Sequence, residues 1–219
     1  MERTVYFVLT FLEAAVGVFG IRVYEMPRYT VVRQLDDGVE IRRYGARSAA
    51  ETTVAGPDRQ HAAEEAFSRL FRYITGANAS SQTIAMTAPV QQGPAQVPTA
   101  PRSEMIAMTA PVQMQQGPDG SMMMRFFLPR AVERAGAPQP ADAAVRVVSV
   151  PPETIAAQRF SGALSEEAAR LHTGRLLATL QKAGIPTAGT PFVLGYDAPF
   201  TIPILRRNEV AVTVTPSGG

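Results

Sequence analysis

Cysteine is absent from this chain, and histidine occurs only twice. Without cysteine there can be no disulfide, no thiolate metal site, no cysteine nucleophile and no prosthetic group attached through thioethers. The chain also lacks a large excess of charge of either sign: it has 21 lysine and arginine residues against 19 acidic residues, a net charge of +2. The basic residues are scattered, without a run, so nucleic acid is not an expected partner.

The overall composition is typical of a globular protein. Of the 219 residues, 46% are hydrophobic and 18% are charged, which is typical of a folded chain. This length suits one domain of ordinary size, which could be built from two similar halves. The 18 prolines and 17 glycines predict many turns and strand ends.

Residues 1–23 form a hydrophobic segment that we expect to be helical and to serve as a membrane anchor or an export signal. The apolar run at 5–21 is close to the lower length limit for a spanning helix and is expected to provide the membrane contact. Glu13 near its centre would cost about 2.5–3.5 kcal/mol in a bilayer. The expected location is therefore the membrane or the cell envelope. The alternative is a helix packed on the protein's own surface, in a cytoplasmic protein.

Residues 24–216 form the expected domain. Alternating hydrophobicity predicts strands at 29–35, 39–44, 48–55, 122–128, 145–150, 153–160, 191–196 and 209–215. Two helices are predicted at 58–74 and 165–183, each with a capping residue at its start and a glycine just beyond its end. The Ala/Pro-rich stretch 130–144 is expected to be an exposed crossover.

The heptapeptide Ile-Ala-Met-Thr-Ala-Pro-Val occurs twice, at Ile84–Val90 and Ile106–Val112. Alternate positions of each copy are apolar, which predicts a pair of strands with one buried face. The proline in each copy cannot donate to a central ladder, which favours an edge or a strand end. Strands followed by a helix and more strands, twice over, indicate an α+β domain with two pseudo-symmetric halves. Its two helices would pack on a mostly antiparallel sheet, with a cleft between helix and sheet as the natural ligand site.

Groups able to do chemistry are few. His172 falls inside the apolar arc of the second helix, where a buried structural histidine is favoured over a metal ligand. No grouping of Ser, His and Asp is evident. If the chain were an enzyme, its acid or base would have to be Tyr73, Tyr196 or Glu209, and roles in loops or caps explain each of these more simply. The sequence therefore predicts no catalytic residue and no enzymatic activity.

Six short motifs together resemble the SOUL haem-binding protein family. Listed in chain order, they are Val-Glu-Ile-Arg-Arg-Tyr at 39–44, Phe-Arg-Tyr-Ile at 71–74, both heptapeptides, Phe-Phe-Leu-Pro at 126–129, Gly-Tyr-Asp-Ala-Pro at 195–199 and Arg-Asn-Glu-Val at 207–210. They span about residues 24–214, nearly the whole chain after the hydrophobic segment. Each motif alone is modest, whereas their joint occurrence in the family's order is specific.

The resemblance implies a distorted, mostly antiparallel β-barrel of two repeated halves. It also implies that haem or another tetrapyrrole binds non-covalently in an apolar groove beside the first helix, in a carrier, buffer or sensor. Phe67, Leu70 and Phe71 would form the wall, while Arg69 and Arg72 would meet the propionates at the rim. An ordinary core stripe explains the same three apolar residues equally well. An enzyme acting on a small hydrophobic substrate or a tetrapyrrole in this cleft, and a ligand-free interaction module, are the alternatives.

One departure from the family concerns the iron. In some animal members a histidine in the Glu-Ile-Arg-His-Tyr strand has been proposed as the axial ligand, and this chain has Arg43 there. Either haem binds through apolar contact without a protein ligand, or His172 or another residue takes that role.

Overall fold

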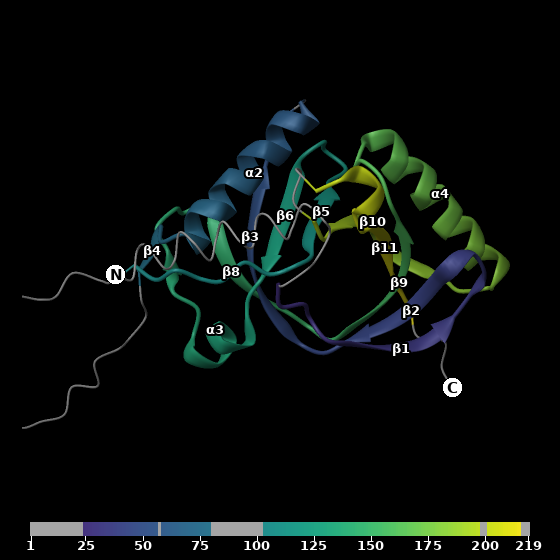
Figure 1. The fold of residues 1–219 in the computed structure, drawn as a ribbon, viewed down its shortest axis with the longest axis horizontal. Helices are drawn as coiled ribbons and strands as arrows, with labels where there is room; N and C mark the ends of the chain where they lie inside the picture. The colour runs from purple at the N-terminus through teal and green to yellow at the C-terminus, as the bar shows by residue number, and fades with distance from the viewer. Residues whose placement is uncertain (1–23, 57, 80–102, 198–200, 216–219) are drawn as a thin grey trace, which may run out of the picture.

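The structure is a computed structural model that describes residues 24–56, 58–79, 103–197 and 201–215 (Figure 1). The strands from the first half of the chain are β1 (Tyr29–Gln34), β2 (Val39–Tyr44), β3 (Arg47–Val54), β4 (Asn78–Ala79), β5 (Val112–Gln116) and β6 (Met122–Phe127). Those from the second half are β7 (Gln139–Pro140), β8 (Val145–Val150), β9 (Glu153–Phe160), β10 (Thr187–Gly195) and β11 (Asn208–Val214). The helices are α2 (Arg59–Ile74), α3 (Arg130–Ala135) and α4 (Glu166–Lys182), with short 3₁₀ turns η1 (Asp36–Gly38) and η2 (Pro203–Leu205).

Within these residues, nine strands form one sheet in the order β1-β2-β9-β11-β10-β5-β6-β3-β8, and each pair of neighbours is antiparallel. The α+β class and the mostly antiparallel sheet are therefore confirmed. The expected closed barrel is wrong, because no ladder in the described part of the chain joins the edge strands β1 and β8. The pair β4 and β7 forms a separate small ladder.

Both long helices cover the same face of the sheet, at its two ends (Figure 1). Side chains of residues paired across antiparallel strands point to the same face of the sheet. Met114 of β5 pairs with Val193 of β10, so both side chains lie on one face. Met114 packs into the core under α2, and Val193 packs into the core under α4. The opposite face carries a smaller apolar cluster and most of the buried ion pairs.

Local sequence explains why the two long helices start where they do. The carboxylate of Asp58 accepts a hydrogen bond from the main-chain N–H of His61 at 3.1 Å, and the hydroxyl of Ser165 accepts one from Ala168, also at 3.1 Å. Each cap satisfies a donor that the first turn leaves without a helical partner. The observed helices match the predicted ones to within a residue at each end.

Two sequence expectations need correction in the described residues. The stretch 130–144 contains α3 and β7, because Arg-Ala-Val-Glu-Arg-Ala forms a helix readily after Pro129 and its Val132 packs on the core under α2. The second heptapeptide is mostly not a strand: β5 begins only at its last residue, Val112, and before that only Thr109 forms a bridge, to Glu25. The proline at 111 has no N–H to give to a ladder.

Other expectations lie outside the described residues. The first heptapeptide, Ile84–Val90, and the hydrophobic segment 1–23 both fall there, so the strand and the N-terminal helix stay predictions. Among the residues that are described, no helix is long and apolar enough to cross a membrane.

The strand order has an approximate two-fold pattern. The edge strand β1 has no counterpart, but if β2, β3, β5 and β6 are exchanged with β8, β9, β10 and β11, the order of the other eight strands reads the same from the other end. In this scheme β3 and β9 correspond, and their burial patterns are identical along eight residues. This correspondence concerns the arrangement of strands, and an internal repeat of the sequence stays a prediction.

Candidate functional site

The outward face of α2 presents two aromatic rings. Phe67 and Phe71 are 37% and 45% exposed, large fractions for phenylalanine, and their rings stack at 5.9 Å between centroids, with 13° between the planes. Phe67 also contacts the edge of buried Phe126 of β6, at 5.4 Å. One turn of helical spacing brings the two rings together, and β6 supports them from below. The result is a flat apolar surface at the junction of α2 with the sheet.

The other predicted residues of α2 lie around these rings in different environments. Leu70 has no exposed surface and belongs to the core between α2 and the sheet, so it supports the face from beneath. Arg69 pairs with Glu65 one turn earlier, at 2.8 Å. Arg72 is more available, because its guanidinium is 3.8 Å from the half-buried carboxylate of Asp142 and its own side chain is more than half exposed.

His172 lies elsewhere. It belongs to α4, at the opposite end of the sheet from α2 (Figure 1), and its ring stacks on Phe160 of β9 with 4.3 Å between centroids. Burial, and then the nearby Arg175, lower the pKa of His172, which favours its neutral form. Its Nδ1 is buried without a hydrogen-bond partner in the described ranges. The structure therefore brings together the five predicted residues of α2 and does not bring His172 to them.

No group of three or more His, Cys, Asp or Glu side chains that could hold a metal ion occurs within the described ranges. Arg43, at the position where some family members carry histidine, is an exposed residue of β2.

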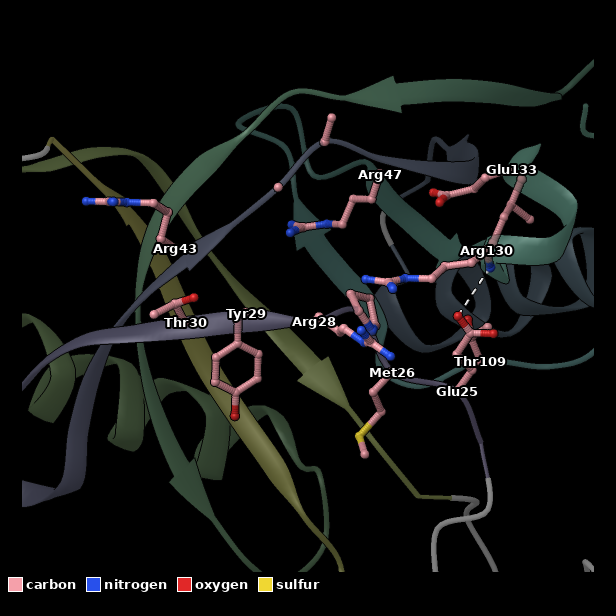
Figure 2. Close-up of a pocket in the computed structure, with 14 residues that line it drawn as sticks. Glu25, Met26, Arg28, Tyr29, Thr30, Arg43, Arg47, Thr109, Arg130 and Glu133 are labelled. Carbon is pink, nitrogen blue, oxygen red and sulfur yellow. Dashed lines mark hydrogen bonds between the residues drawn. The ribbon is translucent and has the colours of Figure 1, made fainter.

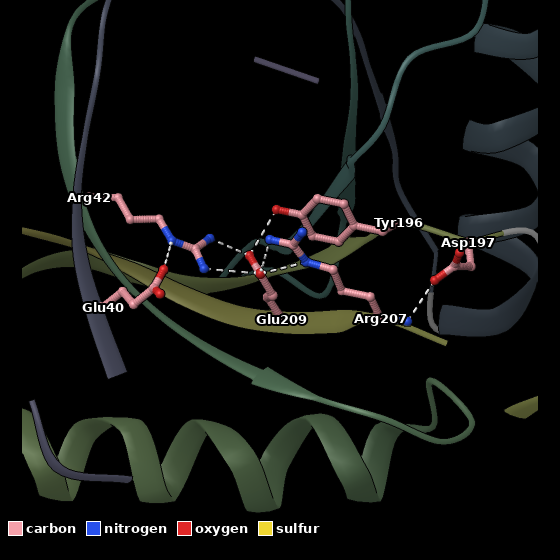
Figure 3. A network of polar contacts seen from close by, with 6 residues as sticks. All are labelled: Glu40, Arg42, Tyr196, Asp197, Arg207 and Glu209. Carbon is pink, nitrogen blue, oxygen red and sulfur yellow. Dashed lines mark hydrogen bonds and ion pairs between the residues drawn. The ribbon is translucent and has the colours of Figure 1, made fainter. Parts of the chain in front are cut away.

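The most extensive buried polar network surrounds Glu209 on β11 (Figure 3). Arg42 of β2 reaches both carboxylate oxygens, at 2.6 and 3.1 Å, and Arg207 donates from Nε and Nη2, at 2.9 and 2.6 Å. The hydroxyl of Tyr196 donates to the same carboxylate at 2.8 Å. Glu209 is fully buried, and Glu40 accepts the remaining edge of Arg42 at 2.8 Å. Sequence reasoning named Tyr196 and Glu209 but could not pair them with Arg42, because that contact joins distant segments.

This network is poorly suited to acid–base catalysis near neutral pH. Burial raises the pKa of Glu209, but the hydrogen bonds and charges of Arg42 and Arg207 outweigh it and hold that pKa below its usual range. Burial and the Glu209 charge raise the pKa of Tyr196 well above its usual range. Both shifts move the pKa of the group farther from pH 7, whereas a proton-transferring group needs a pKa near the working pH. Burial raises the pKa of Tyr73 to about 12, and its hydroxyl donates to the carbonyl of Pro138 at 2.9 Å. All three residues named for an enzyme are thus held in structural roles.

Comparisons with solved structures show the fold alone. The C-terminal domain of EcmrR superposes with a TM-score of 0.55 at 9% sequence identity, covering 85% of this chain and 98% of that one. A cryo-EM structure of an EcmrR–DNA complex gives a TM-score of 0.50 at 10% identity, covering 80% of this chain and 56% of that one. No curated protein matches the chain in sequence.

The family model described as SOUL heme-binding protein matches residues 24–213. This range contains every strand and helix that the structure describes except the last residue of β11, Val214, and it includes the α2 face and the Glu209 network. The match covers most of the chain and agrees with the motifs at 39–44 and 207–210. The chain belongs to the SOUL haem-binding protein family.

Proposed function

We propose that this protein binds haem or another tetrapyrrole non-covalently on the α2 face, as a carrier, buffer or sensor. The observation that carries the proposal is the pair of stacked, exposed rings of Phe67 and Phe71 in a member of a haem-binding family. A macrocycle is flat and apolar, and aromatic rings in offset or edge contact with it gain more than the burial of area alone.

The charges around this surface suit the ligand. A tetrapyrrole with propionate groups needs cations at the edge of its apolar platform, and arginine binds carboxylates well. Arg72 meets this need because the one ion pair it forms in the described part of the chain is long, and its own side chain is exposed. Arg69 would have to share its guanidinium with Glu65. Leu70 contributes by fixing the helix on the sheet and does not contact the ligand directly.

Iron ligation is not required in this proposal. Arg43 cannot replace an axial histidine, and His172 lies at the other end of the sheet from Phe67. We therefore propose that the macrocycle binds mainly through apolar contact, so that metal-free tetrapyrroles bind as well as haem. His172 is kept as a separate test for iron ligation.

The test is an absorbance titration of the full chain with haemin and, in parallel, with protoporphyrin IX. Phe67→Asp and Phe71→Asp should each weaken binding of both ligands about tenfold or more, because each removes buried apolar contact and places a carboxylate beside the propionates. Leu171→Asp, at an exposed leucine of α4, is the matched control and should leave binding unchanged. Circular dichroism of each variant checks that the fold is kept.

The results separate the possibilities. Equal affinity for haemin and protoporphyrin IX, unchanged in His172→Ala, would support the proposed surface. A Soret band that His172→Ala abolishes would instead place the iron at α4. Saturable binding that neither Asp variant weakens would show that the α2 face is the wrong site.

We further propose that the protein has no catalytic activity, does not bind nucleic acid and acts at the membrane or in the cell envelope. The first point is supported by the pKa directions of Glu209 and Tyr196 and the second by the scattered basic residues. The third rests on the apolar run at 5–21.

A further inference from the structure

A cavity lies on the face of the sheet opposite the flat apolar surface of α2. It has a volume of about 430 Å³, within the range of small-molecule pockets, and lies between the start of β1, the β2–β3 corner and α3 (Figure 2). Phe126 packs under α2, so its neighbour Phe127 faces the other side of β6, where Arg47 lies over its ring. The cavity is therefore separate from the surface formed by Phe67 and Phe71.

Arg47 is the unusual residue of this cavity. Its guanidinium is held against two aromatic rings, 4.1 Å from the centroid of Tyr44 and 4.6 Å from that of Phe127. Its side chain is only 10% exposed, and Nη2 donates to Glu153. Nε and Nη1, however, are buried without a hydrogen-bond partner among the residues that the structure describes.

Such unpaired donors are costly. A guanidinium carries five N–H bonds, three of them on Nε and Nη1, and a buried donor without an acceptor keeps its full desolvation penalty. Burial, with Glu153 only partly compensating, lowers the pKa of Arg47. A rigid, stacked guanidinium that lacks acceptors and lines a cavity is preorganised for an anionic group.

Two further arginines would add positive charge for an anionic group in this cavity. Figure 2 shows the guanidinium groups of Arg28 and Arg130 directed into the same space as that of Arg47, whereas Arg43 points away. Arg28 and Arg130 are exposed, and neither guanidinium is in an ion pair with any residue that the structure describes. The two carboxylates of the lining already accept main-chain N–H groups: Glu133 from Ser48, and Glu25 from Arg130 at 3.2 Å. Neither carboxylate is in an ion pair with the guanidinium groups of Arg28, Arg47 or Arg130 among the residues that the structure describes.

We propose that this cavity binds a small organic acid, with its oxyanion group, a carboxylate or a phosphate, on Arg47 and its apolar body against Met26 and Tyr29. Arg28 and Arg130 contribute charge at the mouth. The site is independent of tetrapyrrole binding on the α2 face, because the two lie on opposite sides of the sheet.

The test uses three probes with the same organic body: benzoate, phenyl phosphate and neutral benzyl alcohol. Each is titrated into the full-length protein by calorimetry, and the arginine Nε–H signals are followed by nuclear magnetic resonance. At least one anion should bind saturably and shift the Arg47 signal, while benzyl alcohol should not. The anion that binds more tightly identifies the source of the oxyanion as a carboxylate or a phosphate.

Variants then locate the site. Arg47→Gln should weaken binding about tenfold or more, as expected for the loss of hydrogen bonds to a charged group. If Arg47→Gln fails to fold, the exposed Arg28→Gln still tests the site and should weaken binding severalfold. Arg33→Gln, which removes the same charge farther along β1, outside the cavity, is the matched control and should bind as the wild type does.

Three results would overturn the proposal: no saturable binding of either anion, an unshifted Arg47 signal on binding, or equal weakening in Arg33→Gln and Arg28→Gln. Saturating haemin should leave the affinity for the anion unchanged. Mutual exclusion would show that the cavity receives tetrapyrrole propionates and is not a separate site. Because the titration needs no haemin, its failure and the failure of tetrapyrrole binding can be told apart.

Discussion

At the residue scale, Glu209 connects the C-terminal strands β10 and β11 to β2, which is far away in the chain. Its carboxylate is fully buried and joins β11 to Arg42 of β2 and to Tyr196 at the end of β10 (Figure 3). Breaking a buried ion pair by removing one partner costs more than the pair itself contributes, because the remaining charge keeps its desolvation penalty. In this network, two arginines would lose their shared partner.

We predict that Glu209→Gln lowers the free energy of unfolding by about 3–5 kcal/mol, measured by urea denaturation. Because the folded-state pKa of Glu209 is held below its ordinary value of 4.5, its contribution is present above that pH and is lost as the pH falls through the folded pKa. The variant should therefore lose part of the acid sensitivity of the wild type. Arg43→Gln, at an exposed neighbour on β2, is the control; a loss below about 1 kcal/mol in Glu209→Gln would contradict the prediction.

Arg47 shows why part of the candidate chemistry could not be predicted from the sequence. The local pattern around it predicts only the start of a strand, and this is what β3 is. Its burial depends on Tyr44, Phe127 and Glu153, which come from other strands. Phe67 and Phe71 were easier to name, because helical spacing alone places them on one face.

At the element scale, α2 carries the proposed ligand surface and depends on its cap. We predict that Asp58→Ala destabilises the protein by about 1 kcal/mol, because the N–H of His61 loses its acceptor. Asp58→Asn keeps an oxygen in the same place and should change the stability little. Thermal unfolding of both variants compares them, and equal loss of stability in the two would show that the charge, not the cap, matters.

The long elements were predictable for the same kind of reason. Caps, glycine stops and alternation are local signals, and they locate α2, α4 and most strands of the sheet. The corrections concern contacts that local pattern does not contain. Thr109 lies in an irregular segment held by Glu25 and by the carbonyl of Phe127, and α3 exists because Val132 finds the core. Closure of the sheet into a barrel likewise depends on its edges, which no local motif specifies.

At the scale of the whole molecule, the domain 24–216 and the hydrophobic segment 1–23 are expected to act separately. We predict that the full chain is found in the membrane fraction, or in the envelope after removal of the segment, and that a variant lacking residues 1–23 stays in the cytoplasm. Cell fractionation with an antibody to the domain makes the comparison. A full-length protein found only in the soluble cytoplasmic fraction would contradict the anchor and the signal alike.

The exchange of strands between the two halves has a kinetic consequence. Val39 on β2 pairs with Gln158 on β9, and Arg47 on β3 pairs with Val150 on β8, so each half of the sheet contains a strand from the other half of the chain. Contacts between such distant residues form only after a large loss of chain entropy, which slows folding. On the ribosome, β2 must wait for β9 to emerge. β2 can pair with β1 as soon as both have emerged, but synthesis leaves its other edge unpaired until β9 has been made.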